Sequence, residues 1–156
     1  ETGRSAMASS KTLWKLTAGA LLSLAAQPAL PSHPSHLVEG IRAYENGQFK
    51  QAYSVFASHA DTTNPKALYY LSALYLSGKG VDQDEFKAFE YCKMAAEEGL
   101  AEAQFQLGVM YLDGVGMMDE DEMLALEWLW RAADNGHEHA REMFDFVLNR
   151  DFTIGC

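Results

Sequence analysis

The chain repeats one pattern, and this repeat constrains its fold more than any other feature. Five residues recur after 36 positions: Ala67, Leu71, Tyr75, Gly78 and Gly80 return as Ala103, Leu107, Tyr111, Gly114 and Gly116. Four more recur after 37 positions: Ala88, Ala95, Ala96 and Gly99 return as Ala125, Ala132, Ala133 and Gly136. One residue is therefore inserted between Gly116 and Ala125. A period of this length predicts a stacked array of helix pairs.

Apolar spacing, caps and glycines predict where the helices lie. We expect helices over residues 65–77 and 85–97 in the first copy, and over 101–113 and about 120–134 in the second. Asn64 is suited to cap the first of these helices, with Pro65 at its first position. Glycine pairs form the turns. The side chains expected to face inward in the first copy are Ala67, Leu71, Leu74, Tyr75, Phe86, Phe89, Tyr91 or Cys92, Ala95 and Ala96.

Partial copies flank the two full ones, so residues 37–150 form one all-α repeat domain. Residues 37–60 predict a degenerate helix pair in the same register, because Ala52 stands 36 positions before Ala88. The full repeats occupy residues 64–99 and 100–136. Residues 137–150 predict one more helix, with charged residues on one side as in the cap of a solenoid. The predicted fold is an α-solenoid of antiparallel helix pairs.

The segments outside this domain predict export. Residues 1–6 read as a remnant of recombinant expression, and residues 7–29 resemble a signal peptide, with Lys11 and Lys15 before an apolar run from Leu16 to Ala26. That run is too short to span a bilayer, which takes about 20 residues; a buried core helix is the alternative interpretation. Residues 30–36 form a proline-containing linker and 151–156 a tail. We expect a periplasmic or secreted bacterial protein.

The charge favours some partners over others. From Pro31 onward the chain holds 9 Lys and Arg against 21 Asp and Glu, a balance of -12 within a total of -10. Such a surface repels phosphate backbones and anionic membranes, so we expect no nucleic acid partner and no membrane contact beyond the cleaved signal. A basic protein is the expected partner. The alternative is that the charge only keeps the protein soluble.

The second copy resembles the Sel-one-like repeat (SLR) family, a branch of the tetratricopeptide-like helical repeats. The residues that carry the resemblance are Ala103, Leu107, Gly108, Met110, Tyr111, Gly114, Gly116, Ala125, Trp128, Ala132, Ala133 and Gly136. The first copy has Ser72 where the family usually has Gly. It matches the family through Ala67, Leu71, Tyr75, Gly78, Gly80, Val81, Asp84, Lys87, Ala88, Lys93, Ala95, Ala96 and Gly99. The resemblance covers roughly 110 residues, counting the degenerate flanks. It implies a right-handed superhelix whose concave face binds another protein. Secreted bacterial members look like envelope adaptors, signalling inhibitors or immunity proteins.

No set of residues predicts catalysis, a cofactor or a metal site. His137 and His139 are two residues apart, which on a helix places them on different sides. The Gly78–Gly80 loop lacks the frame of a phosphate loop. The acidic run 119–122 lacks the spacing of a calcium loop, and the linker histidines His33 and His36 are expected to be solvated.

Two cysteines leave an alternative open. A bond between Cys92 and Cys156 is possible in an oxidising compartment, but the spacing of Cys92 favours a buried, unpaired thiol.

We therefore hypothesise a non-enzymatic, exported module that binds a protein in its groove and no small-molecule substrate. It would act as an immunity protein that neutralises an effector, or as an envelope adaptor; the alternative is a structural component of a periplasmic machine. The positions expected to face the partner lie off the core stripe of each first helix or in the acidic insertion. They are Tyr70, Ala73, Gln106, Val109, Asp113, Met117, Met118 and Arg141. Packing against the next helix is the alternative role for the apolar ones.

Overall fold

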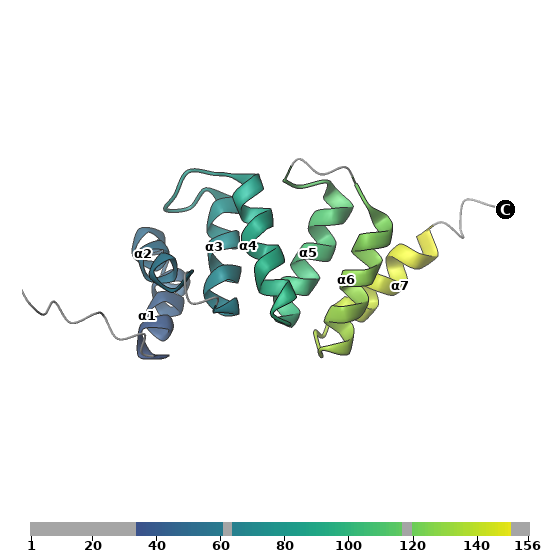
Figure 1. Cartoon of the computed structure of the whole chain (residues 1–156), viewed down its shortest axis with the longest axis horizontal. Coiled ribbons are helices and arrows are strands. Elements are labelled where there is room, and N and C mark those ends of the chain that lie inside the picture. Colours follow the sequence, from purple (N-terminus) through teal and green to yellow (C-terminus); the bar gives the residue numbers. More distant parts are fainter. Residues whose placement is uncertain (1–33, 61–63, 117–119, 151–156) are drawn as a thin grey trace, which may run out of the picture. The chain divides into compact units, whose positions relative to one another are not determined.

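Seven α-helices and no strand are found in the part of the chain that the computed structural model describes, which is residues 34–60, 64–116 and 120–150. They are α1 (Pro34–Glu45), α2 (Phe49–Ala60), α3 (Pro65–Ser77), α4 (Glu85–Glu97), α5 (Ala101–Asp113), α6 (Glu122–Asp134) and α7 (Ala140–Arg150). Each helix packs mainly against its neighbours in the sequence, and the helices follow one another in chain order (Figure 1). The first helices of successive pairs are α1, α3, α5 and α7. The second helices are α2, α4 and α6.

The chain divides into two units, residues 1–32 and 33–156, and all seven helices belong to the second. The predicted signal segment, most of the linker and the tail lie outside the described residues. No helix in the described ranges is long and apolar enough to cross a membrane.

Three predicted helices, α3, α4 and α5, have the bounds expected from the sequence. The caps explain two of the starts. The Asn64 side chain accepts hydrogen bonds from the backbone N–H groups of Lys66 and Ala67, at 3.1 and 3.3 Å. Asp84 accepts one from the N–H of Lys87 at 3.0 Å. These carboxylate and amide oxygens satisfy donors that an α-helix leaves unpaired at its first turn.

Three other helix starts differ from the prediction. The linker was expected to reach residue 36, but α1 already begins at Pro34, since proline fits the first turn of a helix. The α6 helix begins at Glu122 rather than near Glu120, because Asp121 caps it. The last helix begins at Ala140 rather than His137, because residues 137–139 form a turn in which the Ala140 N–H bonds to the His137 carbonyl.

The core stripe follows the prediction with one exception. Ala67, Leu71, Leu74 and Tyr75 are all buried, as expected, and so are Phe89, Cys92, Ala95 and Ala96 in α4. The prediction that Phe86 faces inward is wrong, since its side chain is 53% exposed. Phe86 precedes the buried Ala88 by two residues, which places it on the opposite side of the helix.

The second glycine of each turn packs against the second helix of the preceding pair. Gly80 has φ +77°, and a Cβ there would lie 2.5 Å from the Phe49 carbonyl carbon at the start of α2. Gly116 has φ +83°, and a Cβ there would lie 2.7 Å from the Phe89 Cβ in α4. The turns of the two copies therefore need glycine for backbone conformation and for close approach. The phosphate-loop alternative at residues 78–80 is not needed to explain them.

Replacing Gly80 by Ala tests this contact. The positive φ alone costs a non-glycine residue about 1–2 kcal/mol, and the clash with α2 adds about 1–3 kcal/mol. We expect the free energy of unfolding of Gly80→Ala, measured by urea denaturation, to fall by about 2–5 kcal/mol.

Gly99→Ala is the matched control for Gly80→Ala. Gly99 has φ +87°, but nothing lies within 4 Å of the position that a methyl group would take there. Its variant should lose only the conformational cost, about 1–2 kcal/mol. Equal losses in the two variants would contradict the packing role of Gly80.

The two helices of each pair approach closely at one small residue. In the second copy a Cβ on Gly108 would lie 2.9 Å from Leu129 Cγ and 3.2 Å from the Ala125 carbonyl oxygen. In the first copy the equivalent residue is Ser72, whose hydroxyl donates to the Ala88 carbonyl at 2.7 Å. Ala88 is the counterpart of Ala125. The hydroxyl that Ser72 adds, where the family usually has Gly, therefore has a hydrogen-bond partner inside the helix pair.

A second substitution makes room for the serine. Cys92 holds the position that Leu129 holds in α6, and its side chain is smaller. Both residues are fully buried. Ser with Cys in one copy thus corresponds to Gly with Leu in the other. At the first-helix position the first copy has the larger side chain, and at the second-helix position the second copy does.

This compensation predicts a coupled pair of substitutions. Cys92→Leu alone should overpack the site against Ser72 and destabilise the protein by about 1–3 kcal/mol. Adding Ser72→Gly should restore much of that loss, because the pair then matches Gly108 and Leu129. Urea denaturation of both single variants and the double variant measures the coupling. Additive effects of the two substitutions would refute it.

Candidate functional site

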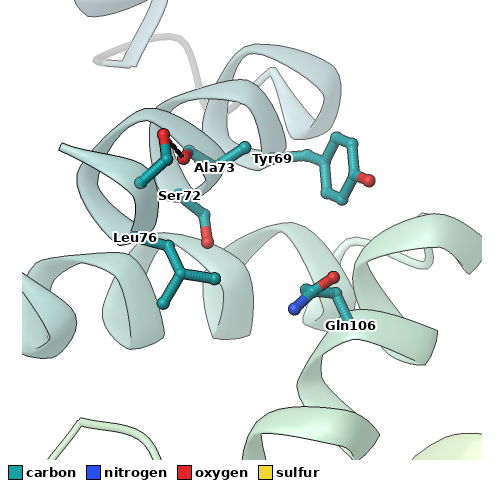
Figure 2. A pocket seen from close by; sticks show the side chains of 6 residues that line it. Tyr69, Ser72, Ala73, Leu76 and Gln106 are labelled. Carbon is teal, nitrogen blue, oxygen red and sulfur yellow. Dashed lines mark hydrogen bonds between the residues drawn. The ribbon is translucent and has the colours of Figure 1, made fainter. Parts of the chain in front are cut away.

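A small pocket opens between α3 and α5, two successive first helices. Its volume is about 140 Å³. Figure 2 shows the Gln106 side chain of α5 facing the residues of α3. The lining residues are Tyr69, Ser72, Ala73, Leu76, Ser77 and Gln106.

The pocket exists because α3 carries small residues on this side. Ser72, Ala73 and Ser77 leave space between Tyr69 and Leu76. Both serine hydroxyls are already used within the fold, since Ser72 donates to the Ala88 carbonyl and Ser77 to the Ala73 carbonyl, each at 2.7 Å. The serines therefore present short and mostly apolar surfaces to the pocket.

The amide of Gln106 is a polar group that the pocket offers to a ligand. Among the described residues it has no hydrogen-bond partner, and Gln side chains present both a donor and an acceptor. It can therefore bond a peptide group, which also carries one of each.

The size of the pocket limits what it can hold. Pockets for drug-sized ligands and cofactors measure about 300–1,000 Å³. A cavity of about 150 Å³ with apolar walls admits a group the size of benzene. The α3–α5 pocket thus fits a single apolar side chain rather than a metabolite.

Two tyrosines lie near the pocket, both uncharged at neutral pH, and the charge of Glu102 acts on both of them. Burial raises the pKa of Tyr69 above its ordinary value, with smaller contributions from neighbouring groups that include Glu102. Burial also raises the pKa of Tyr70, followed by the negative charge of Glu45. Glu102 and Asp113 are exposed on α5. A ligand therefore meets neutral tyrosines with the carboxylate of Glu102 close by.

The structure brings together two of the predicted site residues, Ala73 and Gln106, in this pocket. Tyr70 does not line it: the ring stacks on Phe56, with centroids 4.8 Å apart, and meets Tyr44 edge-on at 5.1 Å. Tyr70 thus packs on α1 and α2 of the preceding pair rather than on the next helix, and its contact with a partner stays a prediction.

The other predicted site residues lie elsewhere. Val109 is half-buried and Asp113 exposed on α5, and neither lines the pocket. Arg141 is exposed on α7, where it pairs with Asp145 at 3.6 Å. Met117 and Met118 lie outside the described residues.

Sequence reasoning missed four of the lining residues: Tyr69, Ser72, Leu76 and Ser77. A signal for them exists. Tyr69, Ala73 and Leu76 have the i, i+4, i+7 spacing of one helix face, which is rotated by one residue from the face that begins at Tyr70. The sequence offered two adjacent tyrosines, and only the packing of Phe56 against one of them separates their roles.

The described residues hold no group of three or more His, Cys, Asp or Glu side chains that could bind a metal ion. The geometry predicted for His137 and His139 is wrong, because both residues precede α7 instead of lying on it. Their rings meet edge-on with centroids 6.3 Å apart, and His137 stacks on Phe105 at 4.3 Å. Burial lowers the pKa of His137, so that it favours the neutral form.

Cys92 is a fully buried thiol with no disulfide partner among the described residues, and it donates to the Ala103 carbonyl at 3.4 Å. Burial raises the pKa of Cys92 to about 12. Since the thiolate is the reactive form, Cys92 is suited to packing rather than to nucleophilic chemistry. Cys156 lies outside the described residues, and the absence of a bond between the two stays a prediction.

Stacked helix pairs joined by glycine turns define an α-solenoid of the tetratricopeptide-like class. Within that class, residues 65–100 and 101–137 match the Sel1 repeat. Residues 65–137 are therefore two Sel1 repeats, as the sequence predicted, and the predicted all-α solenoid is confirmed as well.

Two solved structures share this fold. A Sel1 repeat protein from Oxalobacter formigenes matches 76% of this chain and 47% of its own, with a TM-score of 0.70 and 28% identity. A protective antigen from uropathogenic Escherichia coli strains, which displays an SLR fold, matches 76% of this chain and 26% of its own, with a TM-score of 0.69 and 28% identity.

One curated relative is an exopolysaccharide production negative regulator from Rhizobium leguminosarum bv. viciae. It is 25% identical over 159 residues, which cover 70% of this chain and 59% of the relative. The chain thus spans less than two thirds of these longer proteins. Sel1 repeat proteins are protein-interaction modules, some of which act in regulation, and their fold is typically a non-catalytic scaffold.

Proposed function

We propose that this protein is an exported bacterial binding module that holds a segment of a protein partner across α3 and α5. The observation that carries the proposal is the α3–α5 pocket, which has the size of one side chain in a fold that binds proteins. The partner inserts one apolar side chain between Tyr69 and Leu76. The Gln106 amide bonds to the partner's backbone beside it.

The energy of such contacts is adequate for specific recognition. Burial of one Leu or Met side chain contributes about 1.5–3 kcal/mol, and each 1.4 kcal/mol changes the dissociation constant about tenfold. The carboxylate of Glu102 on α5, whose charge acts on Tyr69, adds attraction for basic residues that flank the anchor. A basic partner is therefore part of the proposal.

The role that we propose is that of an envelope adaptor or of an immunity protein that neutralises a basic effector; a structural component of a periplasmic machine is the second candidate. Export is supported by the pattern of residues 7–29. The similarity to a bacterial protective antigen and to a negative regulator supports an interaction that controls the partner rather than a reaction.

Filling the pocket tests the binding site. A photo-crosslinking residue at Gln106 should form an adduct with one protein in the native host, because Gln106 faces the anchor. Introducing Ala73→Met into the same chain should reduce that adduct about tenfold or more, since the longer side chain occupies the space of the anchor. Gel shift and mass spectrometry of the adduct provide the measurement.

The matched control places the same crosslinker at Glu90, an exposed residue of α4 outside the pocket. It should give no adduct with that protein. Adducts of equal yield at both positions, or an adduct at Gln106 that Ala73→Met leaves unchanged, would count against the pocket as the binding site.

Export has its own test. A chain expressed in a Gram-negative host from Met7 onward should appear in the periplasmic fraction with a mass that corresponds to cleavage between residues 25 and 30, where small residues follow the apolar run. Replacing Leu21 and Leu22 by Arg should block this processing, because charges interrupt the apolar region. An uncleaved chain in the cytoplasmic fraction of the unaltered protein would refute export.

A further inference from the structure

A second apolar surface lies on α6 and α7 and shares no residue and no helix with the α3–α5 pocket. It is a shallow hollow of about 350 Å³. At its edge the side chain of Met123 is 78% exposed and that of Trp130 is 53% exposed. We call it the Trp130 surface. Its lining residues are Met123, Leu124, Leu126, Glu127, Trp130 and Phe144.

The repeat fold does not require a tryptophan at position 130. The alignment that pairs Ala125 with Ala88 and Ala132 with Ala95 pairs Trp130 with Lys93, which is exposed on α4. A lysine therefore satisfies every packing need of this position in the other copy. Trp is the side chain most enriched among the residues that dominate protein interfaces. Its presence at an exposed position points to binding.

Within the described residues, the hollow lacks a contact that the preceding pair has. Phe89 holds in α4 the position of Leu126 in α6, and it is only 4% exposed. Gly116 of the next turn packs on it, and the Tyr111 ring meets it edge-on at 5.5 Å. Within residues 120–150 no following turn covers Leu126 in this way.

A further helix of the same repeat is a poor occupant. Asp145 stands in α7 where α5 has Gly108, and it pairs with Arg141, which stands where α5 has Gln104. A further helix that approached Asp145 as Leu129 approaches Gly108 would bury this ion pair, at a cost of several kcal/mol per ion. The occupant is therefore an element of another kind.

The charge of this region selects a basic occupant. Residues 120–150 contain three arginines against eight Asp and Glu residues. All three arginines already pair with carboxylates, at 2.5, 3.6 and 3.0 Å: Arg131 with Glu127, Arg141 with Asp145, and Arg150 with Glu122. The excess carboxylates give the surroundings of the hollow a negative potential, which attracts cations and repels a second copy of this acidic chain.

We propose that the Trp130 surface docks a basic amphipathic helix of a protein partner. Met123, Leu126 and Trp130 follow one another at i, i+3 and i+7, so they form a straight apolar stripe of about two helical turns. A partner helix laid along this stripe places apolar residues at the same spacing against it, while its lysines and arginines reach the carboxylates. The proposal does not depend on the α3–α5 pocket. With both surfaces occupied, the protein connects two partners.

A synthetic helical peptide of leucine and lysine, with the leucines at i, i+3, i+4 and i+7, serves as the probe. Its binding to the full chain is followed by the anisotropy of a dye on the peptide. Trp130→Gln keeps the charge of the protein and should weaken binding about tenfold or more, as expected for loss of a central aromatic anchor. The thermal unfolding of Trp130→Gln should match that of the unaltered protein, because the first copy folds with the polar Lys93 at the equivalent position.

The matched control is Phe86→Gln. Phe86 is also 53% exposed on a second helix, but it lies outside the hollow, so this variant should bind the peptide as the unaltered protein does. Ala73→Met should also leave peptide binding unchanged, which separates this surface from the α3–α5 pocket. A peptide with glutamate in place of lysine should not bind.

Three results would overturn the proposal. One is equal binding by the Trp130→Gln variant and the unaltered protein. Another is equal binding of the glutamate peptide. The third is a homodimer in sedimentation velocity that Trp130→Gln converts to a monomer, since this would assign the surface to a second copy of the chain.

Discussion

The array depends on the contact between each glycine turn and the second helix of the pair before it. Gly80 touches the start of α2, and Gly116 touches α4 at Phe89. These contacts connect one helix pair to the next, whereas the contacts at Ser72 and Gly108 hold the two helices of a pair together. A repeat that cannot bury its apolar face alone needs both kinds. The glycines thus serve stacking, and they leave the first helices free to differ in the side chains they expose.

That freedom is what produces the α3–α5 pocket. The residues that differ between the copies, such as Ala73 in α3 and Val109 in α5, lie where the fold accepts several sizes of side chain. Smaller residues in α3 leave space that a partner can fill. The Trp130 surface also depends on a position that differs between the copies, here on a second helix, which holds lysine in the first copy and tryptophan in the second. Shape comes from the shared residues, and the binding surfaces come from the others.

The sequence was sufficient to predict the repeat, the family and the bounds of α3, α4 and α5, because these depend on local signals such as Asn64, Asp84 and the turn glycines. It was less informative about which side chains remain accessible. Phe86 was expected inside and lies outside, and Tyr70 was expected to face a partner but stacks on Phe56. The stacking of Tyr70 depends on a contact with another helix, whereas the exposure of Phe86 follows from its place on α4, two residues before the buried Ala88. Periodicity gives the direction of a side chain on its own helix, but not the presence of a neighbour beyond it.

The exchange of Ser72 and Cys92 for Gly108 and Leu129 has a consequence for how such arrays diversify. Neither residue of one copy fits well with the partner residue of the other, so a repeat that is duplicated or recombined keeps its packing only if both positions travel together. They lie 20 residues apart in the first copy and 21 in the second. The heritable unit of this array is therefore the whole helix pair, and recombination within a pair is expected to be selected against while recombination at the turns is tolerated.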